Sequence, residues 1–175
     1  RFGPVREVVH QADAGLVRAG NRRNLPLIGL LGLLTLANLA FHASVLGLLM
    51  VDPTACLYAA LALIVLIETV MAGRVIPAFT MNAIAGLRLK SDPRREKLTA
   101  LATVAALLWW VLAPAGVVGA LLLLLAAALQ LTRLAGWKPW ATRRRPILWI
   151  LHLSYAWLPI GLTLLALHQV GWVPI

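Results

Sequence analysis

Five long apolar stretches constrain the fold of this chain more than any other feature of its sequence. They cover residues 25–50, 54–76, 97–113, 115–134 and 147–167 of 175. Each is close to the roughly 20 apolar residues that a helix needs to cross the hydrocarbon core of a bilayer. Only 13% of the residues are charged, whereas a soluble domain has about a quarter. We therefore predict an all-α, polytopic transmembrane bundle of about five spanning helices, with short interfacial helices beside it.

The distribution of basic residues predicts the orientation of this bundle. All 16 Lys and Arg residues fall before the first stretch, at or after the end of the second, or between the end of the fourth, where Arg133 lies, and the fifth. The turns at Asp52 and Pro114 contain none. By the positive-inside rule the basic side faces the cytoplasm, which places the N-terminal end of this chain inside. Anionic lipid headgroups then account for the net charge of +10, and we expect no nucleic-acid partner.

The chain divides into a lead-in at residues 1–24 and a five-span bundle at residues 25–175. The lead-in has apolar side chains at helical spacing among charged ones, which is typical of an amphipathic helix on the cytoplasmic membrane surface. Residues 77–89 are a second interfacial candidate, because Pro77 is expected to stop the preceding helix. Asp92 and Pro93 resemble a capped helix start. No methionine opens the chain, which fits a piece of a longer membrane protein.

Polar residues inside the apolar stretches are the candidates for chemistry. Glu68 and Arg74 lie in one stretch, and such charges usually face a protein interior or mark a functional site. Thr35, Asn38 and His42 fall within about 60° of each other on a helix. For Thr35 and Asn38, hydrogen bonding to a neighbouring helix is an equal alternative, whereas an imidazole can bind metal or carry a proton.

The last stretch has a similar polar face. His152, Tyr155 and Thr163 lie on one side of the expected helix, interrupted by Pro159. At about 1.5 Å per residue, Glu68 and His152 lie about 12 Å and 8 Å from the inner side and are expected to meet at one level. The alternative for His152 is a position among the lipid headgroups. The lone Cys56 is expected to be a small buried side chain, not a ligand.

Two segments resemble motifs of a known family. Residues 73–82, GRVIPAFTMN, are similar to the central motif of the NnrS family, and residues 147–158, ILWILHLSYAWL, are similar to a second motif. The segment GNRRN at 20–24, followed by the span with Asn38 and His42, also fits. The resemblance implies a bacterial inner-membrane protein of about twelve spans, of which this chain matches the middle. It also implies haem, copper and a role in the nitric oxide response and denitrification.

Two functions follow from these observations. The first is a haem- and copper-binding protein that handles nitric oxide or protects against nitrosative stress. Its candidate ligands are His42 and His152, with Met71 and Met81 as further copper candidates; Arg74 would pair a haem propionate, and Tyr155 and Thr163 would support His152. The alternative is a secondary transporter in which Glu68 and Asn38 line a polar path with His42 or His152. Whether the protein is an enzyme stays open at this point.

Overall fold

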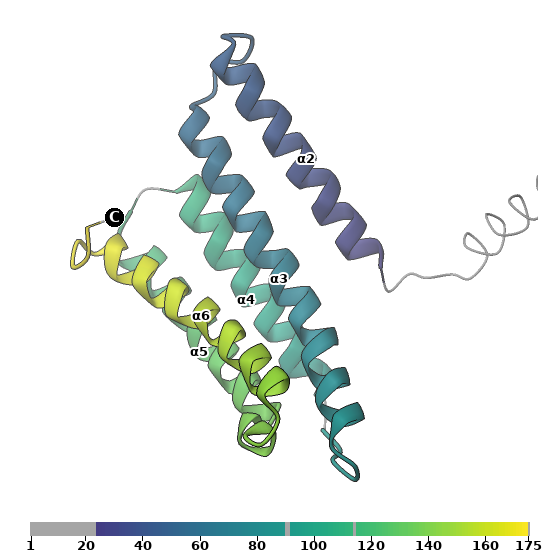
Figure 1. Ribbon diagram of the computed structural model, residues 1–175. Helices are drawn as coiled ribbons and strands as arrows, with labels where there is room; N and C mark the ends of the chain where they lie inside the picture. The colour runs from purple at the N-terminus through teal and green to yellow at the C-terminus, as the bar shows by residue number, and fades with distance from the viewer. Residues whose placement is uncertain (1–23, 90–91, 114, 175) are drawn as a thin grey trace, which may run out of the picture.

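The protein is a bundle of five long α-helices in the computed structural model, which describes residues 24–89, 92–113 and 115–174 (Figure 1). No strand occurs within these ranges, so the predicted all-α class is confirmed. A short 3₁₀ helix precedes the last long helix. The elements are α2 (Leu25–Val45), α3 (Pro53–Ala83), α4 (Pro93–Leu112), α5 (Val117–Gly136), η1 (Pro139–Thr142) and α6 (Pro146–Gln169).

Four of the five long helices are candidate membrane spans by length and hydropathy, namely α2, α3, α5 and α6. The helix α4 is 20 residues long but begins with the charged sequence Pro93-Arg-Arg-Glu-Lys. Those charges keep α4 out of the set of candidate spans. Membrane crossing by α4 therefore remains a prediction, while its formation as a helix is confirmed.

The helices alternate in direction and are arranged around α3 and α4 (Figure 1). The pairs α2–α3, α4–α5 and α5–α6 pack along their lengths, and α3 also contacts α4 and α6. The core lies among α3, α4, α5 and α6, where Leu107, Leu123 and Leu162 are almost completely buried. In contrast, α2 has no buried residue at all. It is attached to one side of a four-helix core.

Helix starts follow the sequence signals closely. The side chains of Asp52 and Asp92 accept hydrogen bonds of 3.0 Å from the backbone N–H groups of Thr54 and Arg94. Each aspartate thus caps a helix that opens with proline, a favoured arrangement because proline has no N–H to leave unpaired. The capped start predicted at Asp92 is confirmed.

Two predicted helix ends are wrong. The first helix ends at Val45 instead of residue 50, and a turn follows in which Gly47 has a φ of +74°. More importantly, Pro77 does not end α3, which continues to Ala83. Residues 77–83 are therefore part of a 31-residue helix, not of an interfacial one. Pro77 costs one backbone hydrogen bond, but Ile76 and Thr80 are buried on either side of it, and this packing offsets the loss.

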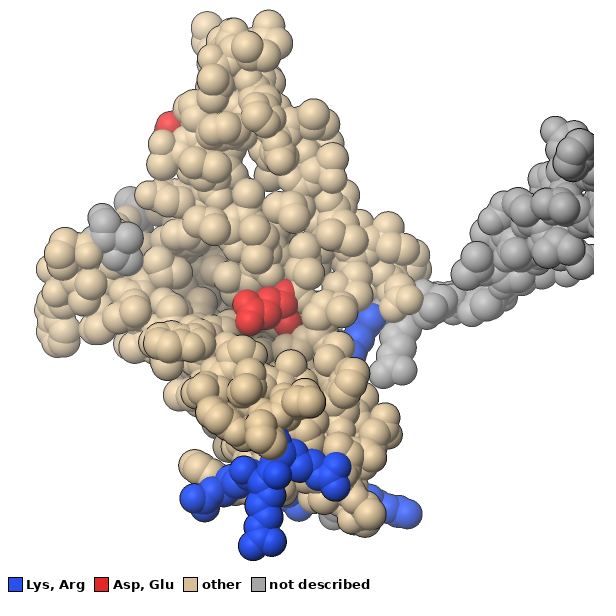
Figure 2. Space-filling view, viewed as in Figure 1, with Lys and Arg blue, Asp and Glu red and all other residues tan. Residues whose placement is uncertain are grey.

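Charge is separated along the bundle. Most of the Lys and Arg side chains visible in Figure 2 gather toward one end, one lies at about mid-height, and most of the remaining surface is uncharged. This arrangement agrees with the predicted separation of basic and non-basic turns. The predicted lead-in helix falls at 1–24 and, apart from Asn24, lies outside the described residues.

Candidate functional site

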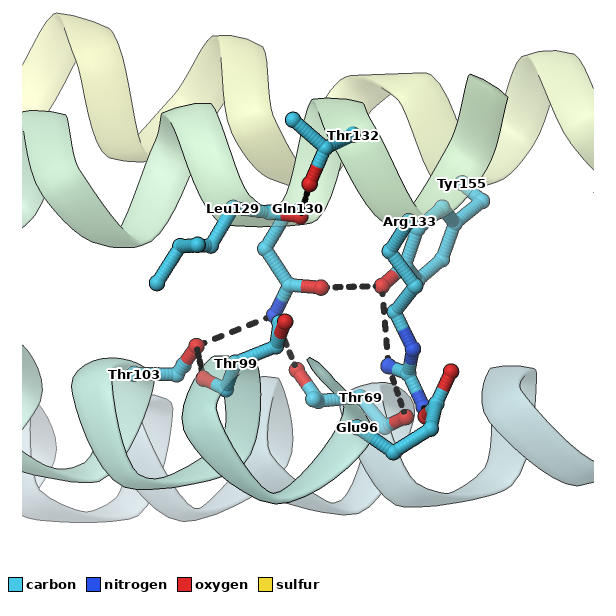
Figure 3. Close-up of polar contacts among 9 residues, drawn as sticks. All are labelled: Thr69, Glu96, Thr99, Thr103, Leu129, Gln130, Thr132, Arg133 and Tyr155. Carbon is cyan, nitrogen blue, oxygen red and sulfur yellow. Dashed lines mark hydrogen bonds and ion pairs between the residues drawn. The ribbon is translucent and has the colours of Figure 1, made fainter. Parts of the chain in front are cut away.

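A buried arginine lies where four helices meet near the basic end. Arg133 on α5 has a side chain that is only 6% exposed. Its Nη2 donates to Glu96 Oε2 on α4 at 2.5 Å, and its Nη1 donates to the Thr69 carbonyl on α3 at 2.9 Å and to the Tyr155 hydroxyl on α6 at 3.1 Å (Figure 3). Its guanidinium also lies 5.1 Å from the centre of the Trp137 ring, within cation–π range.

Gln130 extends this network one helical turn further into the bundle. Its Nε2 donates to the hydroxyls of Thr103 at 3.0 Å and Thr69 at 3.2 Å, and its Oε1 accepts from the Tyr155 hydroxyl (Figure 3). Gln130 and Arg133 thus each contact α3, α4 and α6 from α5. Arg133 Nε is buried without a hydrogen-bond partner, but the other contacts of Gln130 and Arg133 connect the four helices, and polar networks of this kind help to fix the relative positions of packed helices.

A glycine makes room for the buried arginine. A Cβ atom added at Gly73 would lie 1.8 Å from Arg133 Nη2 and 2.8 Å from its Cζ, far inside van der Waals contact. Gly73 is the first residue of the segment 73–82 that carries the family resemblance. The side chain of Arg133 therefore crosses α3 at the one position of that turn that has no side chain.

Arg74 belongs to a separate pocket at the basic end. Its Nη1 donates to Asn24 Oδ1 at the start of α2 at 2.9 Å. The pocket has a volume of about 230 Å³ and is also lined by Arg95, Asp92 and Glu96. The pocket therefore holds charges of both signs. The structure does not bring Arg74 to the cavity beside His152, which has different lining residues.

His152 is buried in α6 and has one ring nitrogen without a partner. The side chain is 3% exposed, which argues against a position among lipid headgroups. Its Nδ1 is 2.9 Å from the Leu148 carbonyl, so Nδ1 carries the hydrogen. Its Nε2 is buried and has no hydrogen-bond partner. A neutral imidazole in this tautomer presents the Nε2 lone pair, which is the form that binds metals.

A cavity of about 480 Å³ lies beside this imidazole. His152 forms part of its wall with residues of α5, η1 and α6, among them Trp140, Trp149 and Arg143. Two aromatic rings and one basic side chain thus line the same apolar space as the histidine. Arg143, not Arg74, is the arginine that shares a cavity with His152.

The other residues predicted for the His152 face have different partners. The Tyr155 hydroxyl is bound to Gln130 and Arg133, and the Thr163 hydroxyl donates to the Pro159 carbonyl of its own helix at 2.8 Å. Neither forms a hydrogen bond with His152 in the described structure. They belong to the same helix but not to one ligand cluster.

The polar residues of α2 point away from the core. Thr35, Asn38 and His42 are all exposed, and the Thr35 hydroxyl donates to the Leu31 carbonyl of its own helix. His42 lies near the non-basic end of α2, whereas His152 lies near the basic end of α6. The two predicted ligands are therefore not brought together by the described helices.

Glu68 and His152 do not meet either. Glu68 is exposed and lies in a groove with Val65 of its own helix and residues 157–165 of α6, one to three turns beyond His152. Across the described ranges it forms no hydrogen bond or ion pair. The depth estimate from residue counting is wrong here, because α3 runs on through Pro77 to Ala83 and Glu68 lies in the middle of the helix.

The cysteine and methionine side chains of the described residues do not form a set of metal ligands. Cys56 is buried and free, as expected for a small packed side chain. Met71 and Met81 are 41% and 39% exposed on α3. The described part of the chain contains no group of three or more His, Cys, Asp or Glu side chains that could hold a metal ion.

Sequence reasoning missed Arg133 and Gln130, although the signal was present. In the sequence, Arg133 is one of the basic residues near the end of the fourth apolar stretch, and Gln130 is a single polar residue within that stretch. However, Gln130 and Arg133 are three residues apart near the end of the fourth apolar stretch. Glu96, Thr99 and Thr103 follow one another at intervals of three and four residues at the start of the third. Two polar faces at one depth on adjacent helices predict a contact between them.

Comparisons with known proteins agree with the motif resemblance. A search of curated proteins and a search of solved structures each returned no match. The profile of the NnrS protein family matches residues 9–175, which is nearly the whole chain. The match includes the Gly73 segment, the His152 segment and all five long helices. This chain therefore belongs to the NnrS protein family.

Proposed function

We propose that this membrane protein binds haem through His152 and takes part in handling nitric oxide or protecting against nitrosative stress. The observation that carries the proposal is the buried, unpartnered Nε2 of His152, with its Nδ1 turned to the Leu148 carbonyl. Haem iron requires only one protein imidazole as an axial ligand. His152 lies in the wall of an apolar cavity of about 480 Å³, which supports this proposal.

The surroundings of His152 suit a planar apolar ligand with acidic edges. Trp140 and Trp149 supply flat aromatic surface, and Arg143 supplies a cation at the basic end. Arginine pairs well with carboxylates, so Arg143 would hold a propionate, a role that the sequence had suggested for Arg74. When bound, haem would supply an iron that can bind a diatomic ligand such as nitric oxide.

Copper fits the described residues less well. A copper site generally draws on several imidazole, thiolate or thioether ligands. His42 is exposed near the far end of the bundle from His152, and no cluster of ligating side chains forms within the described ranges. We therefore derive no step through copper from these helices.

The charge separation supports a location in the bacterial inner membrane with the basic end in the cytoplasm. In that orientation, the His152 cavity and the Arg74 pocket both lie toward the cytoplasmic side. The transporter alternative rests on one observation, the exposed Glu68 at the centre of α3. A haem spectrum separates the two functions.

The test is absorption spectroscopy on the purified full chain, with haem content measured as the pyridine haemochrome. The wild-type protein is expected to show a Soret band, and His152→Ala is expected to lose it. His168→Ala is the matched control, because His168 lies on the same helix with its Nδ1 at 3.0 Å from the Val173 carbonyl. An unchanged spectrum with full haem occupancy in His152→Ala would overturn the assignment.

A further inference from the structure

The carboxylate of Glu68 lies at the middle of a long apolar helix. Glu68 is the central residue of the 31-residue α3, with 15 residues on either side. Figure 2 shows acidic atoms at mid-height on an otherwise largely uncharged face, away from the basic end. A carboxylate at such a depth is expensive to leave in hydrocarbon and normally faces protein or water.

The five described helices do not provide that environment. Glu68 is exposed and makes no hydrogen bond or ion pair with any described residue. It borders a groove of about 420 Å³ between α3 and α6, whose other walls include Val65, Trp157 and Leu165. The groove is apolar apart from the carboxylate, and Trp157 at its edge is 67% exposed.

The shape of this groove admits a helix. Gly161 lies in it, and a Cβ added there would meet no atom within 4 Å. Small residues on an open helix face let a second backbone approach closely in membranes. The exposed side chains around Gly161 are those of Trp157, Ile160 and Leu164, which would pack beside such a helix.

We propose that the α3–α6 groove binds a further membrane-spanning helix that presents a Lys or Arg side chain to Glu68. A Lys or Arg side chain complements the negative charge of Glu68, whereas a lipid acyl chain has no hydrogen-bond donor to offer the carboxylate. Charge complementarity therefore favours the helix over an acyl chain. It also selects against a second copy of these helices. Along α3 the nearest basic side chain, Arg74, is six residues from Glu68 and donates to Asn24, and Arg133 is buried and paired with Glu96.

This inference does not depend on haem binding. It concerns a different face of the bundle from the His152 cavity, since the two sets of lining residues share no member. Loss of the Soret band in His152→Ala would leave the groove intact. Conversely, a substitution in the groove should release the docked helix before it affects His152.

The experiment is photo-crosslinking in native membranes of cells that make the full-length protein. A benzophenone amino acid replaces Leu164, which lines the groove and is 45% exposed. The expected product joins this position to a membrane-spanning peptide that contains Lys or Arg. The same probe at Leu121, which is 61% exposed on α5, is the control and should yield lipid adducts only.

A second variant makes the role of the charge testable. Glu68→Leu should reduce the crosslinked peptide by about tenfold or more, which corresponds to about 1.4 kcal/mol, whereas Glu68→Asp should retain it. Because Glu68 has no partner in the bundle, both variants should fold and reach the membrane. Crosslinks at Leu164 to lipid only, to a second copy of these helices, or to a peptide without a basic residue would overturn the proposal, as would an unchanged yield in Glu68→Leu.

Discussion

Single residues in this bundle show how a buried charge is accommodated in an apolar protein. Arg133 has acceptors on three neighbouring helices, including the carboxylate of Glu96. Removal of one partner from a buried pair typically costs more than the pair contributes, because the other charge stays buried. Arg133 is therefore expected to be sensitive to changes that displace it without removing it, above all at Gly73.

The substitution Gly73→Ala should destabilise the protein strongly. The new methyl group would overlap the guanidinium of Arg133, which must shift and weaken its hydrogen bond to Glu96, at a cost of about 1.5–3 kcal/mol. Thermal unfolding in detergent measures this loss. Gly32→Ala is the control, since no atom lies within 4 Å of its Cβ position. A melting temperature for Gly73→Ala equal to that of the control would contradict the structure at this contact.

Gln130 provides a second residue-scale test. Gln130→Leu keeps the size of the side chain but removes the acceptor of the Tyr155 hydroxyl and the donor to Thr69 and Thr103. The expected loss is about 1–3 kcal/mol, or a melting temperature lower by several degrees. Thr132→Val should have little effect, because Thr132 is exposed and bonds only to the Leu129 carbonyl of its own helix. Equal stability of the two variants would argue against the network.

At the scale of elements, α3 shows how tertiary packing overrides a local signal. Proline inside a helix costs about 3 kcal/mol, and this led to the prediction that Pro77 ends the helix. The structure continues α3 for six residues beyond it. Ile76 is 2% exposed and Thr80 is completely buried, and the Thr80 hydroxyl donates to the Ile76 carbonyl at 2.8 Å.

Replacing Pro77 should therefore strengthen α3 and not change its course. In Pro77→Ala, the new N–H can donate to the Gly73 carbonyl, which lies four residues earlier. Hydrogen exchange of residues 78–83 should become slower. Pro53→Ala is the matched control at the first position of the same helix, where no intrahelical bond is gained. Faster exchange in Pro77→Ala would mean that residues 77–83 are not part of a continuous helix.

At the scale of the whole molecule, the separation of charge is the feature that relates the bundle to a membrane. Most of the basic side chains visible in Figure 2 lie toward one end, and the α2–α3 turn lies at the other end in Figure 1. The positive-inside rule then predicts that the basic end faces the cytoplasm.

Cysteine labelling tests this topology. In a Cys56→Ala background, Met50→Cys and Ala115→Cys should react with a membrane-impermeant maleimide added to intact spheroplasts. Both positions are exposed at the non-basic turns. Arg144→Cys at the basic end should react only after the membrane is opened. The reverse pattern would show the opposite orientation, and reaction of only one of the two outer positions would show that α4 does not cross.

The sequence by itself determined the helical class, the approximate helix boundaries, the alternation of direction and the separation of charge. These properties depend on local composition, since about 20 apolar residues and the placement of Lys and Arg act without reference to partners. The family also followed from local motifs, at Gly73 and at His152. The NnrS profile over residues 9–175 confirms it.

Only the tertiary structure decided which polar residues meet. His42 and His152 looked equivalent in sequence, yet one is exposed on α2 and the other is buried with a free Nε2. Arg133 looked like a loop charge, yet it is buried where four helices meet. The physical reason is that a residue's environment depends on how neighbouring helices are rotated and shifted against each other. The packing of Gly73 against Arg133 sets that register, and no count of residues along one helix contains it.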